Sequence, residues 1–111
     1  YSDIREANGT SVSKGMAVGP VRVILGSDQF YSFKEGDILV TNQTTPDFVP
    51  LMKSAAAIVA EQGGVTSHAA VVSRELGVPC IVGVNNAMNI FKSGEMVEVD
   101  AINGTIRLLD K

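Results

Sequence analysis

The sequence has one cysteine, one histidine and no tryptophan, and aromatic residues make up only 5% of its 111 residues. Because Cys80 is alone, it cannot form an internal disulfide, and one cysteine with one histidine cannot supply the four ligands of a structural zinc site. The acidic residues are too scattered along the chain to indicate a magnesium site. We therefore expect this domain to bind no metal or other cofactor of its own.

Positive charge is also scarce, because the chain has nine Lys and Arg residues against twelve Asp and Glu residues, and its formal net charge is −3. Such a balance offers no basic surface for nucleic acid or for anionic lipid. The most apolar short segment, residues 55–60, is far below the roughly twenty residues that cross a bilayer. We expect neither a nucleic-acid partner nor a membrane partner. We also expect a reducing cytosolic compartment, because no charged and then apolar leader precedes the first structural segment.

Two common catalytic motifs are missing. The glycine pair at residues 63–64 does not lead into the Gly-Lys-Ser or Gly-Lys-Thr of a P-loop, so the chain has no recognisable ATP site. The glycine-rich stretch at residues 9–24 also lacks the lysine and helix of a phosphate-binding loop, which favours turns there. No Gly-x-Ser-x-Gly elbow is present, and Ser67 is the sequence neighbour of His68, so a Ser-His-Asp hydrolase is not indicated.

A chain of 111 residues, of which 45% are apolar, can bury one hydrophobic core, and this predicts a single domain. Residues 1–8 are polar and charged without periodicity, so we assign them to a linker or tail. Residues 9–109 are assigned to the domain and residues 110–111 to a second tail. The apolar residues before and after Gly19-Pro20 predict two short strands with a bend or bulge at that dipeptide.

An alternation of strand and helix patterns sets the predicted fold class. Strands are predicted at 37–41, 57–60 and 80–84. One helix is predicted over 46–54, and a second helix follows the loop 61–65 and ends at Gly77. This order makes two βαβ units in series, and hence a parallel sheet. Two further segments, 96–100 and 105–108, flank an Asn-Gly pair that is typical of a β-hairpin. The predicted class is α/β, with a short parallel βαβ core and flanking β-hairpins.

The single histidine, His68, lies at the start of the second predicted helix, just past the glycine pair. A helix start presents unpaired N–H groups and the positive end of the helix dipole, so it stabilises an anion without any lysine or arginine. The same positive end disfavours imidazolium and leaves a lone pair free to attack phosphorus. This placement suits a residue that carries a phosphoryl group, although a lone histidine can also be a core or capping residue.

The neighbours of His68 each have a structural and a functional interpretation. Thr66 is predicted as the helix N-cap, with a hydroxyl that accepts a backbone N–H. Gly63 and Gly64 either allow a tight turn or let a phosphoryl group approach the bare backbone. Ser67 either donates a hydrogen bond to phosphoryl oxygens or faces solvent.

Three side chains further along are given structural roles only. Arg74 and Glu75 are predicted to form a solvated face of the histidine helix. Cys80 is predicted to be a small core residue of a buried strand.

The run GGVTSHAA at residues 63–70, continued by SRELGVP at residues 73–79 and by Val82-Gly83, resembles the signature of the mobile phosphohistidine domain of phosphoenolpyruvate-utilising enzymes. That family includes pyruvate phosphate dikinase, phosphoenolpyruvate synthase and enzyme I of the sugar phosphotransferase system. The resemblance extends upstream to residue 36 and downstream to residue 104, so it covers nearly the whole chain.

The resemblance implies a swivelling β/β/α domain whose histidine shuttles a phosphoryl group between two sites on neighbouring domains. It makes His68 the phosphoacceptor, with Gly63, Gly64, Thr66 and Ser67 beside the phosphoryl group. It also puts Thr66 where the dikinases carry a regulatory phosphorylation. The chain would then be the carrier domain of a phosphotransferase of pyruvate metabolism, and it would be inactive alone.

The implied partners are the nucleotide-binding and the phosphoenolpyruvate- or pyruvate-binding domains of the same enzyme or of a partner subunit, and Mg²⁺ is expected there. The alternative is a module that keeps the fold without the transfer, such as the carboxy-terminal extension of some pyruvate kinases. An intact His68 is compatible with both. An ATP-grasp domain before this segment would favour the carrier, and a complete pyruvate kinase before it would favour the module.

Overall fold

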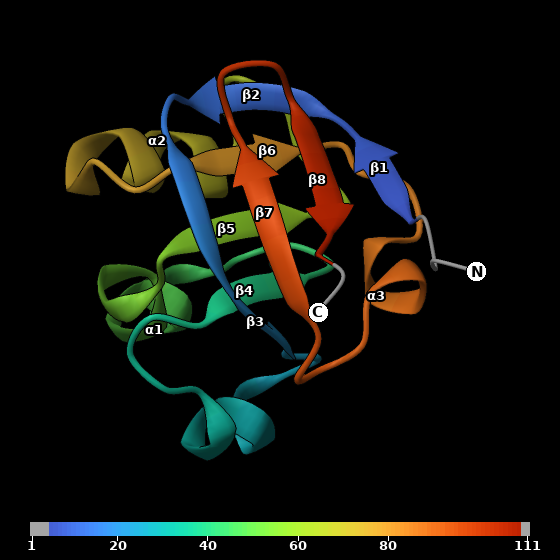
Figure 1. Ribbon diagram of the computed structural model, residues 1–111. Coiled ribbons are helices and arrows are strands. Elements are labelled where there is room, and N and C mark those ends of the chain that lie inside the picture. The colour runs from blue at the N-terminus through green and yellow to red at the C-terminus, as the bar shows by residue number, and fades with distance from the viewer. Residues whose placement is uncertain (1–4, 110–111) are drawn as a thin grey trace.

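The computed structural model describes residues 5–109, which form one eight-stranded sheet with three α-helices (Figure 1). The strands are β1 (Glu6–Asn8), β2 (Thr10–Ser13), β3 (Met16–Val23), β4 (Ile38–Thr41), β5 (Ala57–Ala60), β6 (Cys80–Val82), β7 (Met96–Asp100) and β8 (Thr105–Leu108). The helices are α1 (Val49–Ser54), α2 (His68–Leu76) and α3 (Ala87–Ile90), with 3₁₀ turns η1 (Ser27–Ser32) and η2 (Pro46–Phe48). The strand order is β1-β8-β7-β3-β4-β5-β6-β2.

Strand β3 joins the two halves of this sheet. Its residues 16–20 pair with β7 in an antiparallel ladder, and its residues 21–23 pair with β4 in a parallel one. Strands β4, β5 and β6 are parallel to one another, and α1 and α2 connect them, so both predicted βαβ units are present. The edge strands β1 and β2 are separated along the chain by Gly9 alone, and the sheet therefore curls back toward its own edge (Figure 1).

The curled sheet has two apolar faces, and they create three layers. Side chains alternate between the two faces of each strand, so one row faces the opposite strands and the next row faces the helices. The row toward β7 and β8 includes Val40, Val59 and Ile81, which share a core cluster with Val97 of β7 and Ile106 of β8. The row toward α1 and α2 includes Leu39, Ile58 and Val82, packed with Met52 and Ala70. The predicted α/β class and the β/β/α layer order are confirmed.

The prediction of two strands broken at Gly19-Pro20 is wrong, because β3 runs unbroken through both residues. Gly19 is needed for close packing, since a Cβ there would lie 2.6 Å from the carbonyl oxygen of Gly36. Pro20 has no N–H to offer, and it sits immediately before the parallel pairing of β3 with β4 begins. The irregularity instead falls in β2, where the register shifts between Ser11 and Ser13.

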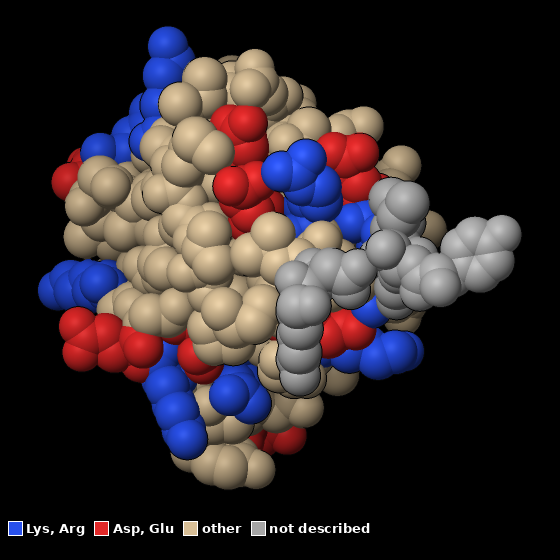
Figure 2. Space-filling view, in the orientation of Figure 1, with Lys and Arg blue, Asp and Glu red and all other residues tan. Residues whose placement is uncertain are grey.

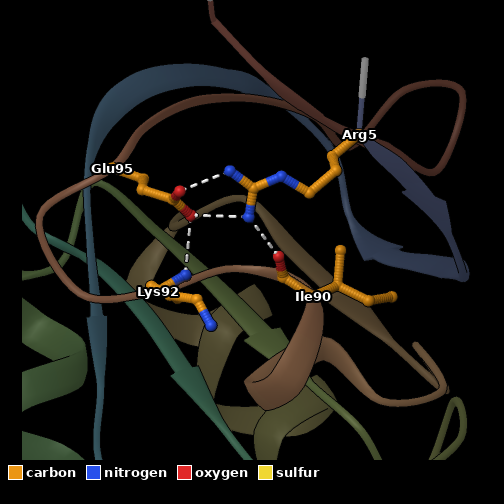
Figure 3. Close-up of polar contacts among 4 residues, drawn as sticks. All are labelled: Arg5, Ile90, Lys92 and Glu95. Carbon is orange, nitrogen blue, oxygen red and sulfur yellow. Dashed lines mark hydrogen bonds and ion pairs between the residues drawn. The ribbon is translucent and has the colours of Figure 1, made fainter. Parts of the chain in front are cut away.

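Strand β1 lies within the segment assigned to a linker or tail, and it pairs with β8 along residues 105–107. Arg5, which precedes it, donates from Nη1 to the carbonyl of Ile90 (2.6 Å) and to Oε1 of Glu95 (3.0 Å), and this carboxylate oxygen also accepts the N–H of Lys92 (2.8 Å) (Figure 3). These contacts fasten the start of β1 to the turn before β7. The remaining tail residues, 1–4 and 110–111, lie outside the described residues.

Charged side chains of both signs are scattered around a broad uncharged area on the face shown in Figure 2, and no large patch of one sign is visible there. Among the helices of residues 5–109, none is long and apolar enough to cross a membrane.

Candidate active site at the start of helix α2

The loop between β5 and α2 leaves the sheet beside the end of β4. The N–H of Glu61 donates to the carbonyl of Thr41 (3.0 Å), and the N–H of Gln62 donates to that of Asn42 (2.9 Å). Gly63 then turns the chain with φ of +120°, and a Cβ at this position would lie 2.9 Å from Oγ of Ser67. Glycine is therefore required at residue 63 for both conformation and space. Gly64 differs, because a Cβ there would meet nothing within 4 Å.

Ser67, rather than Thr66, is the N-cap of α2, so the predicted capping role of Thr66 is wrong. The backbone of Ser67 is extended, and its Oγ accepts the N–H of Ala70 (3.3 Å) while donating to the carbonyl of Gly64 (2.8 Å). Thr66 lies one position outside the helix and is exposed. Two adjacent hydroxyl residues are both good caps, and only the backbone geometry decides between them.

His68 is half-buried at the first position of α2, and its ring contacts a residue in the segment that follows strand β4. Its Nδ1 lies 2.7 Å from Oγ1 of Thr44, a buried residue in the segment between β4 and η2. Among residues 5–109, its Nε2 has no hydrogen-bond partner. The ring is thus fixed through one nitrogen while the other remains available.

A cavity of about 260 Å³ adjoins this ring. It is lined by Gln43, Thr44, Gln62, Gly63, Ser67, His68 and Ala69, so no Lys, Arg, Asp or Glu lines it. The N–H groups of His68 and Ala69, in the first turn of α2, have no hydrogen-bond partner within the described part of the chain, as expected at a helix start. The cavity therefore combines backbone donors and neutral polar groups, a set that suits an anion.

Thr44 was not predicted as a site residue from the sequence. A usable signal was present, because in a parallel sheet the carboxyl ends of neighbouring strands meet at one edge. The segments after β4 and after β5 should therefore lie side by side, and a hydroxyl residue in the first could reach a histidine in the second.

Arg74 is exposed, as predicted, but its guanidinium group also makes two hydrogen bonds to backbone carbonyls. Its Nη2 donates to the carbonyl of Val65 (2.7 Å) and its Nη1 to that of Val12 (3.1 Å). Glu75 is exposed as well, as predicted. The helix itself ends as predicted at Gly77, which has a left-handed φ of 73°.

Cys80 is a buried residue of β6, which confirms its predicted place in the core. Burial raises the pKa of its thiol to about 11, a shift that the nearby Ser73 hydroxyl and the charge of Arg74 partly offset. A thiol of this kind is a poor nucleophile at neutral pH. Within residues 5–109, no three His, Cys, Asp or Glu side chains gather in a way that could hold a metal ion.

Residues 33–104 match the family model described as "PEP-utilising enzyme, mobile domain". The chain is 52% identical over 98 residues to the "Probable phosphoenolpyruvate synthase" of Archaeoglobus fulgidus and, over the same length, 52% identical to the "Phosphoenolpyruvate synthase" of Pyrococcus furiosus. These alignments cover 88% of this chain and 13% and 12% of the relatives. A solution NMR structure of an Enzyme I protein superimposes with a TM-score of 0.60 and 29% identity, over 69% of this chain and 32% of that one.

The family match spans well over half of the chain, and the relatives share about half of its residues over most of its length. The chain itself spans only about an eighth of the length of these curated relatives. It belongs to the mobile-domain family of the PEP-utilising enzymes.

Proposed function

We propose that this domain is a phosphoryl carrier, with Nε2 of His68 as the atom that accepts and returns the phosphoryl group. The observation that carries the proposal is the 2.7 Å contact between Nδ1 of His68 and Oγ1 of Thr44. If Nδ1–H donates to this hydroxyl oxygen, the ring is held in the tautomer whose lone pair lies on Nε2. Nucleophilic attack requires that lone pair.

The transfer step balances without any further group on this domain. The lone pair of Nε2 forms a bond to phosphorus as the bond from phosphorus to the donor oxygen breaks, and that oxygen leaves with the electron pair. The ring becomes positively charged and keeps its proton on Nδ1. Thr44 then accepts a hydrogen bond from a charged donor, and such bonds are roughly twice as strong as neutral ones. At the second site an acceptor oxygen attacks phosphorus, and the lone pair returns to Nε2.

The phosphoryl oxygens would be stabilised by backbone groups. The N–H groups at the start of α2 and the positive end of its dipole favour an anion beside His68. We assign Gly63 and Gly64 to this cradle as exposed backbone, and Thr66 as an exposed neighbour that a kinase could reach. Ser67 already donates its hydroxyl hydrogen to Gly64, which supports a role in shaping the loop rather than in direct contact with phosphate.

The donor and acceptor sites would lie on other domains. The cavity at His68 has no charged lining, so the nucleotide, the phosphoenolpyruvate or pyruvate and the Mg²⁺ that phosphoryl transfer uses are assigned to partner domains of the same enzyme or a partner subunit in the cytosol. The domain alone would then turn over neither ATP nor phosphoenolpyruvate. The names of the relatives favour this carrier over the pyruvate kinase extension.

The test places this chain in a chimera, in place of the mobile domain of the Pyrococcus furiosus phosphoenolpyruvate synthase. Incubation with radiolabelled phosphoenolpyruvate should give one acid-labile phosphoryl group per chain, and His68→Ala should give none. The His68→Ala chimera should still fold, because a half-buried residue at a loop junction loses little packing. An unlabelled but folded parent chimera, or an equally labelled His68→Ala, would overturn the proposal.

A further inference from the structure

Arg74 connects two segments that are far apart in the sequence. One arm of its guanidinium, Nη2, donates to the carbonyl of Val65 in the loop before His68 (2.7 Å). The other arm, Nη1, donates to the carbonyl of Val12 in β2 (3.1 Å). The planar fork of an arginine can reach two acceptors at once, whereas a lysine ammonium offers a point charge on a flexible stem.

The carbonyl of Val12 is available because of the irregularity in β2. Ser11 pairs with Ile81 and Ser13 pairs with Cys80, so Val12 is the extra residue of the bulge and has no ladder partner. A bulge leaves such a residue unpaired, and its polar groups must find another partner. Arg74 supplies that partner, and it makes no ion pair with any Asp or Glu of residues 5–109.

The loop before His68 has few other attachments. The N–H and Oγ of Ser67 both donate to the carbonyl of Gly64, but those bonds lie inside the loop. Among the hydrogen bonds of residues 5–109, the one from Arg74 to Val65 is the only one that links residues 63–66 to the protein beyond Ser67. Residues 63–66 are all exposed, so packing contributes little to holding them.

We propose that Arg74 is a positioning residue that holds the loop 63–67 against the bulge of β2, and that it thereby keeps the backbone donors beside His68 in the geometry that phosphoryl transfer needs. The second half of this proposal rests on the carrier function proposed above. The backbone N–H donors must be in place before charge develops on the phosphoryl oxygens, because moving them into place during the reaction would raise its barrier.

The first experiment measures backbone NMR order parameters in this chain, with Arg74→Gln and Arg74→Lys as the perturbing variants. Arg107→Gln is the matched control, since Arg107 is an exposed arginine that pairs with Glu98 on the opposite layer (2.7 Å). Residues 64–67 should have order parameters of about 0.85 in the parent and the control, and below about 0.6 in both Arg74 variants. Strands β4 and β5 should stay rigid in all of them. An unchanged loop in Arg74→Gln would overturn the proposal.

The second experiment measures labelling of His68 in the chimera. Both Arg74 variants should be labelled at least about fivefold more slowly than the parent at saturating phosphoenolpyruvate, with an unchanged KM, and Arg107→Gln should match the parent. A loosened loop with an unchanged labelling rate would refute the positioning role. A parent chimera that takes no label would overturn the carrier function instead, and the order parameters would then decide alone whether Arg74 holds the loop.

Discussion

Replacing Thr44 by valine removes one hydroxyl group while keeping the branched shape of a side chain that is only 6% exposed. The change leaves Nδ1 of His68 without the partner that lies 2.7 Å away. Loss of a neutral hydrogen bond costs about 1 kcal/mol of folding free energy, which for a domain of this size is a fall of about 4 °C in Tm. Thr44→Ser restores the hydroxyl and is the control for the lost polar group.

The effect on transfer should exceed the effect on stability. In the proposed transfer the ring gains positive charge as the bond to phosphorus forms, which would strengthen the hydrogen bond to Thr44 by about 1–2 kcal/mol. Loss of that bond should therefore slow the labelling of His68 about five- to thirtyfold. The assay compares single-turnover labelling of the parent, Thr44→Val and Thr44→Ser chimeras, together with their melting curves. If Thr44→Val is labelled as fast as the parent, the ring is not positioned through Nδ1.

Three further predictions concern residues around the site. Gly63→Ala should lower the free energy of unfolding by more than about 1 kcal/mol, because the alanine must adopt a positive φ and its Cβ would lie 2.9 Å from Oγ of Ser67. Gly64→Ala should be close to neutral, because its Cβ would meet nothing within 4 Å. Melting curves of the two variants test this difference. Thr66→Glu should leave Tm almost unchanged, since Thr66 is not the cap, yet slow labelling steeply by repelling the phosphoryl group, while Thr66→Ser should be labelled normally. For Cys80, burial raises the thiol pKa from 9.0 to about 11, so the folded state keeps a proton that the unfolded state releases. The stability advantage of the parent over Cys80→Ala should therefore shrink as the pH rises from 9 to 11, and a constant difference in denaturant unfolding would contradict it.

The elements that the sequence predicted are those with a local signal. The parallel strands are short apolar runs, α2 ends at a glycine with positive φ, and β7 and β8 flank an Asn-Gly pair. Each of these features depends on neighbouring residues, so pattern alone was enough to predict them. The position of His68 at a helix start was predictable for the same reason.

The features that the sequence did not predict depend on contacts between distant residues. Thr44 and His68 are 24 residues apart, and Arg74 and Val12 are 62 apart. The pairing of β1 with β8 likewise joins the two ends of the domain. No periodicity links such positions, because the sheet order and the bulge register that bring them together form only in the folded chain. The choice between Thr66 and Ser67 as cap needed the backbone itself.

The proposed carrier role of His68 is tested most directly by identifying the atom that carries phosphorus. His68 is the only histidine in the chain, so isotope-labelled histidine marks a single ring, and NMR of the phosphorylated domain can read the coupling of phosphorus to each ring nitrogen. We expect a one-bond coupling to Nε2, with the proton retained on Nδ1 beside Thr44. Phosphorus on Nδ1, or an acid-stable phosphate on a serine or threonine with His68 unmodified, would contradict it.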